Sequence, residues 1–524
     1  MRIANRKVIY YISLVLFFFS TYIFLLPDSV QYYDYLDFFE GIRPLEQWNP
    51  DRGFVFPFIL WMGTMITSNV LGILVIFSVI YIFSFVYIIK TLQLILKYEN
   101  VEISDAYVYI CVFIVLGINP IIYSCYHVVL TDFVSAFWVI IQFYVSTKFL
   151  LYRITDRKYE KHKYFLYCII SCILIILEYF TKQMYFPISL VIVLFYEIFY
   201  VIKRKEIKNF IYSAILLVAM LFALVGSVKI FGQVTDSSKK QDSFAIIAGG
   251  LRYFEVEGYE HKDGDIRISH YYQGKRKVYI KDDNEENIDE FVYNFDGSFG
   301  NTVKFVFLCL KKNPQRFFQG YYDNYMLLSG FYSRPWEHDY IQYQTGRVVR
   351  HDILKNLYDI GTPEIKNLSQ EIKTSFIPYI LIENVDTQWL VTGWGKNGWS
   401  FWNDRVLNYR EIGGSLVGKI LGKSFFYSIS MSLWAVLITI SPLRFVFYIY
   451  KYCKKREKSI YYSAQAVLNV FCTSQIVFFS ITGCVVDRYL LAGYMAVLIS
   501  FMLFILCAGV RFLCCREWVK RIRV

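Results

Sequence analysis

Long apolar runs separated by short polar stretches make up most of this 524-residue chain. Several runs reach about 20 residues, which lets an α-helix cross the roughly 30 Å hydrocarbon core of a bilayer. The pattern therefore predicts an all-α polytopic membrane protein with about ten transmembrane helices. The predicted spans are residues 8–26, 71–95, 105–119, 129–151, 164–180, 185–202, 210–231, 424–450, 460–484 and 488–511.

Residues 53–69 are apolar but short, and Pro57 lies near their start. Counting them as a full span would move every later basic loop to the opposite side of the membrane. We therefore interpret them as a half-buried or re-entrant helix on the outer face, where protein or a cavity must cover its backbone.

The basic residues predict the orientation of the chain. Net charge is +12, and the strongly basic loops between the predicted spans all fall on one side. Such clusters mark the cytoplasmic side, so both termini are predicted to be cytoplasmic. Because topology accounts for the positive charge, no nucleic-acid partner is expected. The clusters cover residues 2–7, 153–163, 203–208, 451–458 and 511–523.

Composition adds three points to this picture. The chain is 56% hydrophobic, with a mean hydropathy of +0.38, and its abundant Lys, Ile, Tyr and Phe are typical of AT-rich bacterial genomes. Its 11 cysteines include no CxxC pair, so most are expected to pack inside spans. The first apolar run lacks a small-residue cleavage site and is expected to stay as an anchor. We expect a multi-pass protein of the bacterial cell membrane.

The patterning divides the chain into three regions. Residues 1–231 form an N-terminal transmembrane module with a first outer loop at 27–69, and residues 424–524 form a C-terminal module. Between them, residues 232–423 carry charges of both signs and are predicted to be a mixed α/β extracytoplasmic domain. In this insert, YYQGKRKVYIK alternates like a strand, and VKFVFLCLKKNPQRFFQGYYDNYMLL is typical of an amphipathic helix interrupted at Asn313-Pro314.

Acidic residues crowd the point where the chain leaves the first span. The segment LLPDSVQYYDYLDFFEG contains Asp28, Asp34, Asp37 and Glu40. They are either a solvated outer loop or a general base or metal ligand placed where a lipid head group meets water. A carboxylate can take a proton from an acceptor hydroxyl that lies within hydrogen-bond reach.

Another acid, Asp132, lies just inside the outer end of the fourth predicted span. An ionisable group within a span indicates function by default. The alternatives are that Asp132 caps its helix or pairs with a neighbouring span.

Lys182 and Arg488 are cations predicted to lie on the outer face, where the topology rule disfavours them. Arg and Lys both bind phosphate, so a lipid phosphate is one expected partner. Snorkelling at a helix end is the alternative, and Asp487 could also neutralise Arg488.

Four tryptophans lie in the glycine-containing stretch TQWLVTGWGKNGWSFWNDR, and Trp394 and Trp399 are its central pair. Indole rings stack on sugars, but they also settle at membrane interfaces. The Walker, GxGxxG, HExxH and GxSxG motifs are all missing from the sequence. No nucleotide or organic cofactor is therefore expected, and a divalent metal is left open.

Five segments together resemble the GT-C class of integral-membrane glycosyltransferases, which includes protein O-mannosyltransferases and lipid A aminoarabinose transferases. They are PDSVQYYDYLDFFEG, DRGFVFPFILWMG, NPIIYSCYHVVLTDF, KKNPQRFFQGYYDNY and DRYLLAGYMAVL. The resemblance implies a polyprenyl-phosphate-linked sugar donor and an active site on the outer face. The catalytic first-loop acid of the class corresponds to Asp28, or to Asp34 if the register is shifted. The phosphate-binding cations correspond to Lys182 and Arg488.

The sequence thus predicts an inverting glycosyltransferase that uses a polyprenyl-phosphate-sugar donor at the lipid surface. Asp28 would deprotonate the acceptor, Asp132 would position the acceptor or a metal, and Trp394 and Trp399 would bind the acceptor. The insert at 232–423 matches nothing in the class, so the identity of the acceptor stays open. It is a glycan, a lipid or a protein. The alternatives are a flippase or transporter for lipid-linked sugars, a polysaccharide polymerase, and a non-catalytic assembly protein.

Overall fold

The computed structural model describes nine continuous stretches of the chain and a few isolated residues. The stretches are residues 53–66, 70–117, 131–155, 161–182, 185–204, 207–234, 424–454, 460–482 and 490–522. The isolated residues are Val8, Tyr11, Asn119, Ile122 and several between Phe307 and Ser329. Every structural statement below concerns these residues.

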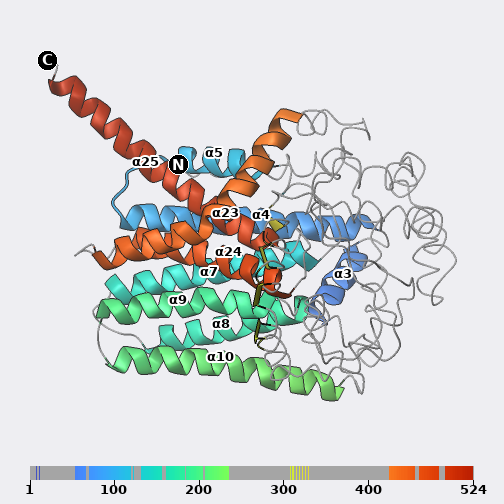
Figure 1. Cartoon of the computed structure of the whole chain (residues 1–524). Helices are drawn as coiled ribbons and strands as arrows, with labels where there is room; N and C mark the ends of the chain where they lie inside the picture. The colour runs from blue at the N-terminus through green and yellow to red at the C-terminus, as the bar shows by residue number, and fades with distance from the viewer. Residues whose placement is uncertain are drawn as a thin grey trace, which may run out of the picture.

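The described residues form helices and no strands, and the long helices run side by side (Figure 1). The described part of the chain is therefore all-α and polytopic, as predicted. The helices are α3 (Val55–Ile66), α4 (Val70–Tyr98), α5 (Asp105–Val112), the π-helical turn η3 (Phe113–Gly117), α7 (Thr131–Thr155), α8 (Lys161–Thr181), α9 (Phe186–Arg204), α10 (Ile207–Val234), α23 (Ser424–Lys454), α24 (Ile460–Thr482) and α25 (Leu491–Ile522).

Seven of these helices are long and apolar enough to cross a membrane, and each coincides with a predicted span. They are Val75–Tyr98, Thr131–Thr155, His162–Thr181, Phe210–Gln233, Leu433–Lys454, Ile460–Ile481 and Leu491–Gly509. The described part of the chain therefore supports a membrane-embedded protein.

Two other predicted spans are helical but less suited to crossing a bilayer. The predicted span 105–119 is the short apolar helix Asp105–Gly117, which covers about 20 Å at 1.5 Å per residue. The helix α9 has 19 residues and carries Glu197, Lys203 and Arg204, which lower its hydropathy. The first predicted span, 8–26, lies outside the described residues except for Val8 and Tyr11, which are both helical.

The helix α3 corresponds to the segment predicted to be a half-buried outer helix. Its 12 residues extend about 18 Å, too little to cross the hydrocarbon core. Its Phe56 and Leu60 side chains are fully buried in the main hydrophobic core. The helix packs against α4, and its first turn lies against the end of α8. Protein therefore covers part of this short helix, as expected because the backbone at the ends of a re-entrant helix must be shielded from lipid.

The alternation of the helices gives the bundle two ends with different chemistry. At one end α7 begins and α8 ends, and we call it the Asp132 end. At the opposite end Tyr461 N donates to Glu99 (2.9 Å) and Arg204 donates to the Arg153 carbonyl (2.7 Å). We call this the basic end, because the described Lys and Arg of the predicted cytoplasmic loops gather there. They are Arg153, Lys163, Lys203, Arg204, Lys208, Lys451 and Lys454. Which end faces the cytoplasm remains a prediction from these charges.

The predicted mixed α/β domain at 232–423 and its strand segment lie outside the described residues, apart from single helical positions between Phe307 and Leu328. Those positions are attached to the bundle. Trp434 of α23 donates its indole N–H to the Leu328 carbonyl (3.1 Å), and the Tyr325 hydroxyl donates to the Thr439 carbonyl (3.3 Å). The end of the predicted amphipathic helix therefore docks onto α23.

Candidate functional site

An ion pair between Lys182 and Asp132 lies at the Asp132 end of the bundle. The Lys182 ammonium is 2.5 Å from Asp132 Oδ1, and the Tyr185 hydroxyl donates to the same oxygen at 3.0 Å. The Lys182 and Asp132 side chains are 14% and 5% exposed, so the pair is largely removed from solvent. The structure thus brings together two residues that the sequence singled out separately.

Local sequence explains how these side chains meet. Asp132 lies in the first turn of α7, where the helix dipole stabilises a negative charge. The Lys182 N–H donates to the Glu178 carbonyl (2.9 Å), which continues the last turn of α8 by one residue. The Tyr185 N–H then donates to the Lys182 carbonyl (3.1 Å), a tight turn that places Tyr185 just before α9. Three helices therefore contribute to one group.

The residues just before α3, within the predicted first outer loop 27–69, reach the same place. Gly53 has a positive φ of 62°, and a Cβ atom there would lie 2.3 Å from the Phe180 carbonyl oxygen. Only glycine allows this backbone approach to the last turn of α8. The next residue, Phe54, packs its ring against Phe180, with ring centroids 4.8 Å apart. Gly53 thus contacts Phe180, which precedes Lys182 by two positions in the sequence. Asp28 and Asp34 lie outside the described residues.

Asn119 and Tyr494 form a second polar contact at the Asp132 end. Asn119, from the Asn-Pro segment, donates its amide to the Tyr494 hydroxyl at 3.0 Å. The Tyr494 ring packs on Trp434 with centroids 4.6 Å apart. Tyr494 belongs to the segment DRYLLAGYM, but Arg488 of that segment lies outside the described residues, as do Trp394 and Trp399.

Sequence analysis missed several ionisable groups buried between α7, α8, α9 and α10. Glu178 is 1% exposed, one turn before Lys182. Toward the basic end, the Arg153 guanidinium lies 2.7 Å from both carboxylate oxygens of Glu197 and stacks 3.3 Å from the centre of the Tyr200 ring. The signal was present for Glu178 and Glu197, because each is an isolated charge inside an apolar run, as Asp132 is. Arg153 was instead interpreted as part of the basic cluster 153–163.

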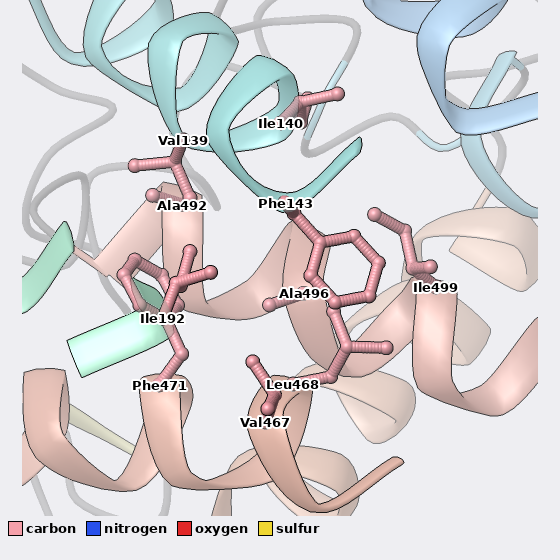
Figure 2. Close-up of a pocket in the computed structure, with 10 residues that line it drawn as sticks. All are labelled: Val139, Ile140, Phe143, Ile192, Val467, Leu468, Phe471, Ala492, Ala496 and Ile499. Atoms are coloured by element: carbon pink, nitrogen blue, oxygen red, sulfur yellow. The ribbon is translucent and has the colours of Figure 1, made fainter. Parts of the chain in front are cut away.

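An apolar pocket lies farther inside the bundle (Figure 2). Side chains of α7, α9, α24 and α25 line it, among them Phe143, Ile192, Phe471 and Ile499. Its volume of about 10 Å³ accommodates at most one water-sized sphere, and its lining offers that water no polar partner. The pocket is therefore a packing gap that is too small for a polyprenyl tail.

The described residues contain no group of three His, Cys, Asp or Glu side chains that could hold a metal ion. Asp132, the described candidate for a metal-positioning role, is instead bonded to Lys182 and Tyr185. The Asp132 carboxylate is thus held by the Lys182 ammonium and the Tyr185 hydroxyl group.

A comparison with protein families, curated proteins and solved structures found no match to the chain. The class that the fold defines is a polytopic α-helical membrane protein. Any more specific function must be argued from the Asp132 end itself.

Proposed function

We propose that the chain is a membrane glycosyltransferase that moves a sugar from a polyprenyl-phosphate-linked donor to an acceptor at the Asp132 end. The observation that carries the proposal is the Lys182–Asp132 pair, which lies where the end of the first outer loop meets α7, α8 and α9. A lone lysine at a predicted outer membrane boundary requires an anionic partner. Asp132 is such a partner and holds the lysine in place.

Lys182 is suited to holding the donor phosphate. Its ammonium carries three N–H donors, one of which reaches Asp132 Oδ1. A donor phosphate that enters beside Asp132 would share the ammonium, and Arg488 would supply a second cation. Held in this way, polyprenyl phosphate leaves as a stable anion and no nucleotide takes part.

The first outer loop is suited to supplying the base. Asp28, or Asp34 in a shifted register, would accept the proton of the acceptor hydroxyl. The acceptor oxygen then bonds to the anomeric carbon as the bond from that carbon to the phosphate oxygen breaks, and the configuration inverts. Asp132 would position the acceptor through Lys182 and Tyr185, and Trp394 and Trp399 would bind the acceptor's sugar rings.

A transporter for lipid-linked sugars is the second candidate, and a specific observation favours it. A transporter needs polar groups deep inside its spans, and Glu178, Gln142, Arg153 and Glu197 are all buried between the helices. The gap beside Glu178 and Gln142 is narrower than a water molecule, however, so in this conformation it accommodates no sugar. We therefore favour the enzyme.

The test is transfer of radiolabelled sugar from a panel of polyprenyl-phosphate donors by membranes that contain the wild type or Asp28→Asn at equal levels. The proposal predicts transfer by the wild type and its loss in the variant. Product size distinguishes a single transfer from a polymerase, which would give a ladder. Absence of transfer from both proteins across the panel would contradict the proposal and favour the transporter or the non-catalytic assembly protein.

A further inference from the structure

Glu178 is buried in the bundle without a charged or hydrogen-bonding partner for its carboxyl group. Its side chain is 1% exposed, and among the described residues neither carboxylate oxygen has a hydrogen-bond partner. An ionised carboxylate in such a place would lose its hydration without compensation, which is a large energetic cost. The neutral acid avoids most of that cost.

The side chains around Glu178 offer few donors to a carboxylate. A narrow gap between α7, α8, α9 and α10 is lined by Glu178 with Trp138, Gln142, Leu174, Ile175, Ser189 and Met220. Three of these are apolar, and the Trp138 indole N–H is already donated to Thr181 Oγ1 at 3.0 Å. Neither Glu178 oxygen receives a hydrogen bond from any of these side chains.

The Gln142 amide is oriented so that it presents an acceptor. Its Nε2 donates to Ser146 Oγ (2.9 Å) and Ser171 Oγ (3.3 Å), which uses both amide hydrogens. Its Oε1 is buried and has no hydrogen-bond partner among the described residues. A neutral carboxylic acid has an O–H to give to this oxygen, whereas a carboxylate has none.

The charged groups on the surrounding helices are engaged elsewhere. On α7 and after α8, Asp132 and Lys182 bond to one another. Arg153 of α7 and Glu197 of α9 form the ion pair toward the basic end. Lys229 of α10 is exposed, and α3, which packs near the end of α8, has no titratable residue. Among the described residues, no cation donates a hydrogen bond to either Glu178 oxygen.

We propose that Glu178 is a proton-binding site inside the membrane-embedded bundle, and that the bound proton is shared with Gln142 Oε1. The proton converts the carboxylate to a neutral acid, whose O–H donates to the amide oxygen. Glu178 lies one helical turn before Lys182, whose ammonium pairs with Asp132 instead. This inference does not depend on the glycosyltransferase proposal.

The test is infrared spectroscopy of the purified full-length chain in lipid at neutral pH, comparing the wild type with Glu178→Gln. We expect the wild type to show the C=O stretching band of a neutral carboxylic acid, which shifts on transfer to heavy water and is lost in the variant. Glu197→Gln is the matched control, because Glu197 is held by Arg153 and should not contribute to the band.

A second variant keeps the test decisive if Glu178→Gln does not fold. Gln142→Leu removes the acceptor but keeps the acid, so the neutral-acid band should remain and move to the higher frequency of a carboxyl that lacks this hydrogen bond. A wild-type spectrum without the band would overturn the proposal, and would mean that the Gln142 amide faces Glu178 with its N–H groups. A band that neither variant changes would also overturn it.

Discussion

The ammonium of Lys182 lies 2.5 Å from Asp132 Oδ1, and this contact ties the end of α8 to the first turn of α7. The two residues are 50 positions apart in the chain, and Tyr185 at the start of α9 donates to the same oxygen. The pair thus links three helices at the end of the bundle where Gly53, just before α3, contacts Phe180 of α8. Its stability and its chemistry can be tested separately.

Removal of one partner from this pair should destabilise the protein more than removal of both. Lys182→Gln leaves the Asp132 carboxylate buried without its counter-ion, so we expect the free energy of unfolding to fall by about 3 kcal/mol. The double variant Lys182→Gln/Asp132→Asn should recover most of this loss. Unfolding of the four proteins of this double-mutant cycle in detergent measures the coupling, and additive losses would mean that the two charges do not interact.

The Arg153–Glu197 pair should depend on the shape of the guanidinium as well as its charge. Arg153 contacts both Glu197 oxygens and stacks on Tyr200, and an ammonium cannot reproduce either geometry. We expect Arg153→Lys to lower the free energy of unfolding by about 2 kcal/mol, the contribution of one hydrogen bond to a charged group. Thermal unfolding in detergent measures this, and a variant as stable as the wild type would show that charge alone suffices.

Gly53→Ala should disturb the contact between the first outer loop and α8. The new Cβ would lie 2.3 Å from a backbone oxygen at a positive φ, so the loop must shift, at a cost of about 1–3 kcal/mol. Gly226→Ala is the control, because nothing lies within 4 Å of its Cβ position in α10. That variant should be neutral or gain up to about 1 kcal/mol from helix propensity. Equal melting temperatures for the two variants would contradict the described approach of Gly53 to Phe180.

The orientation of the bundle should be visible by chemical labelling. Gln233 is exposed near the Asp132 end of α10, and Glu102 is exposed at the basic end between α4 and α5. A membrane-impermeant maleimide added to intact cells should label Gln233→Cys and not Glu102→Cys, in a background without the native cysteines. The reverse result would place the basic end outside and exclude an extracytoplasmic Asp132 site.

Much of the helical architecture could be predicted from the sequence, because a membrane span is encoded locally by length and hydropathy. The α4, α7 and α8 boundaries lie within a few residues of the predicted spans. The segment Asp105–Gly117 also matches its predicted bounds, but it is shorter than the other spans. Its apolar run continues to Gly117, but its first residues include Asp105, which accepts a hydrogen bond from Gln93.

The residues of the candidate site could be predicted one by one, but their contacts with each other could not. Sequence marked Asp132 and Lys182 because charges near a membrane are costly, but their pairing depends on how α7 packs beside α8. The alternative that Asp132 pairs with a neighbouring span is the arrangement found. Glu178 was overlooked although the same rule applies to it, since its burial and its unpartnered oxygens emerge only from the packing of four helices.

The most direct test of the proposed active site is sugar transfer by the double variant Lys182→Gln/Asp132→Asn, which lacks both charges but leaves neither one unpaired. The matched control, Arg153→Met/Glu197→Gln, neutralises the other buried pair at the basic end. We predict that the first variant transfers sugar from polyprenyl-phosphate donors at least about 100-fold more slowly than the wild type, as expected for loss of a charge-stabilising donor. The control should stay near the wild-type rate. Equal transfer by the wild type and the Lys182→Gln/Asp132→Asn variant, at equal protein levels, would contradict an active site at the Asp132 end.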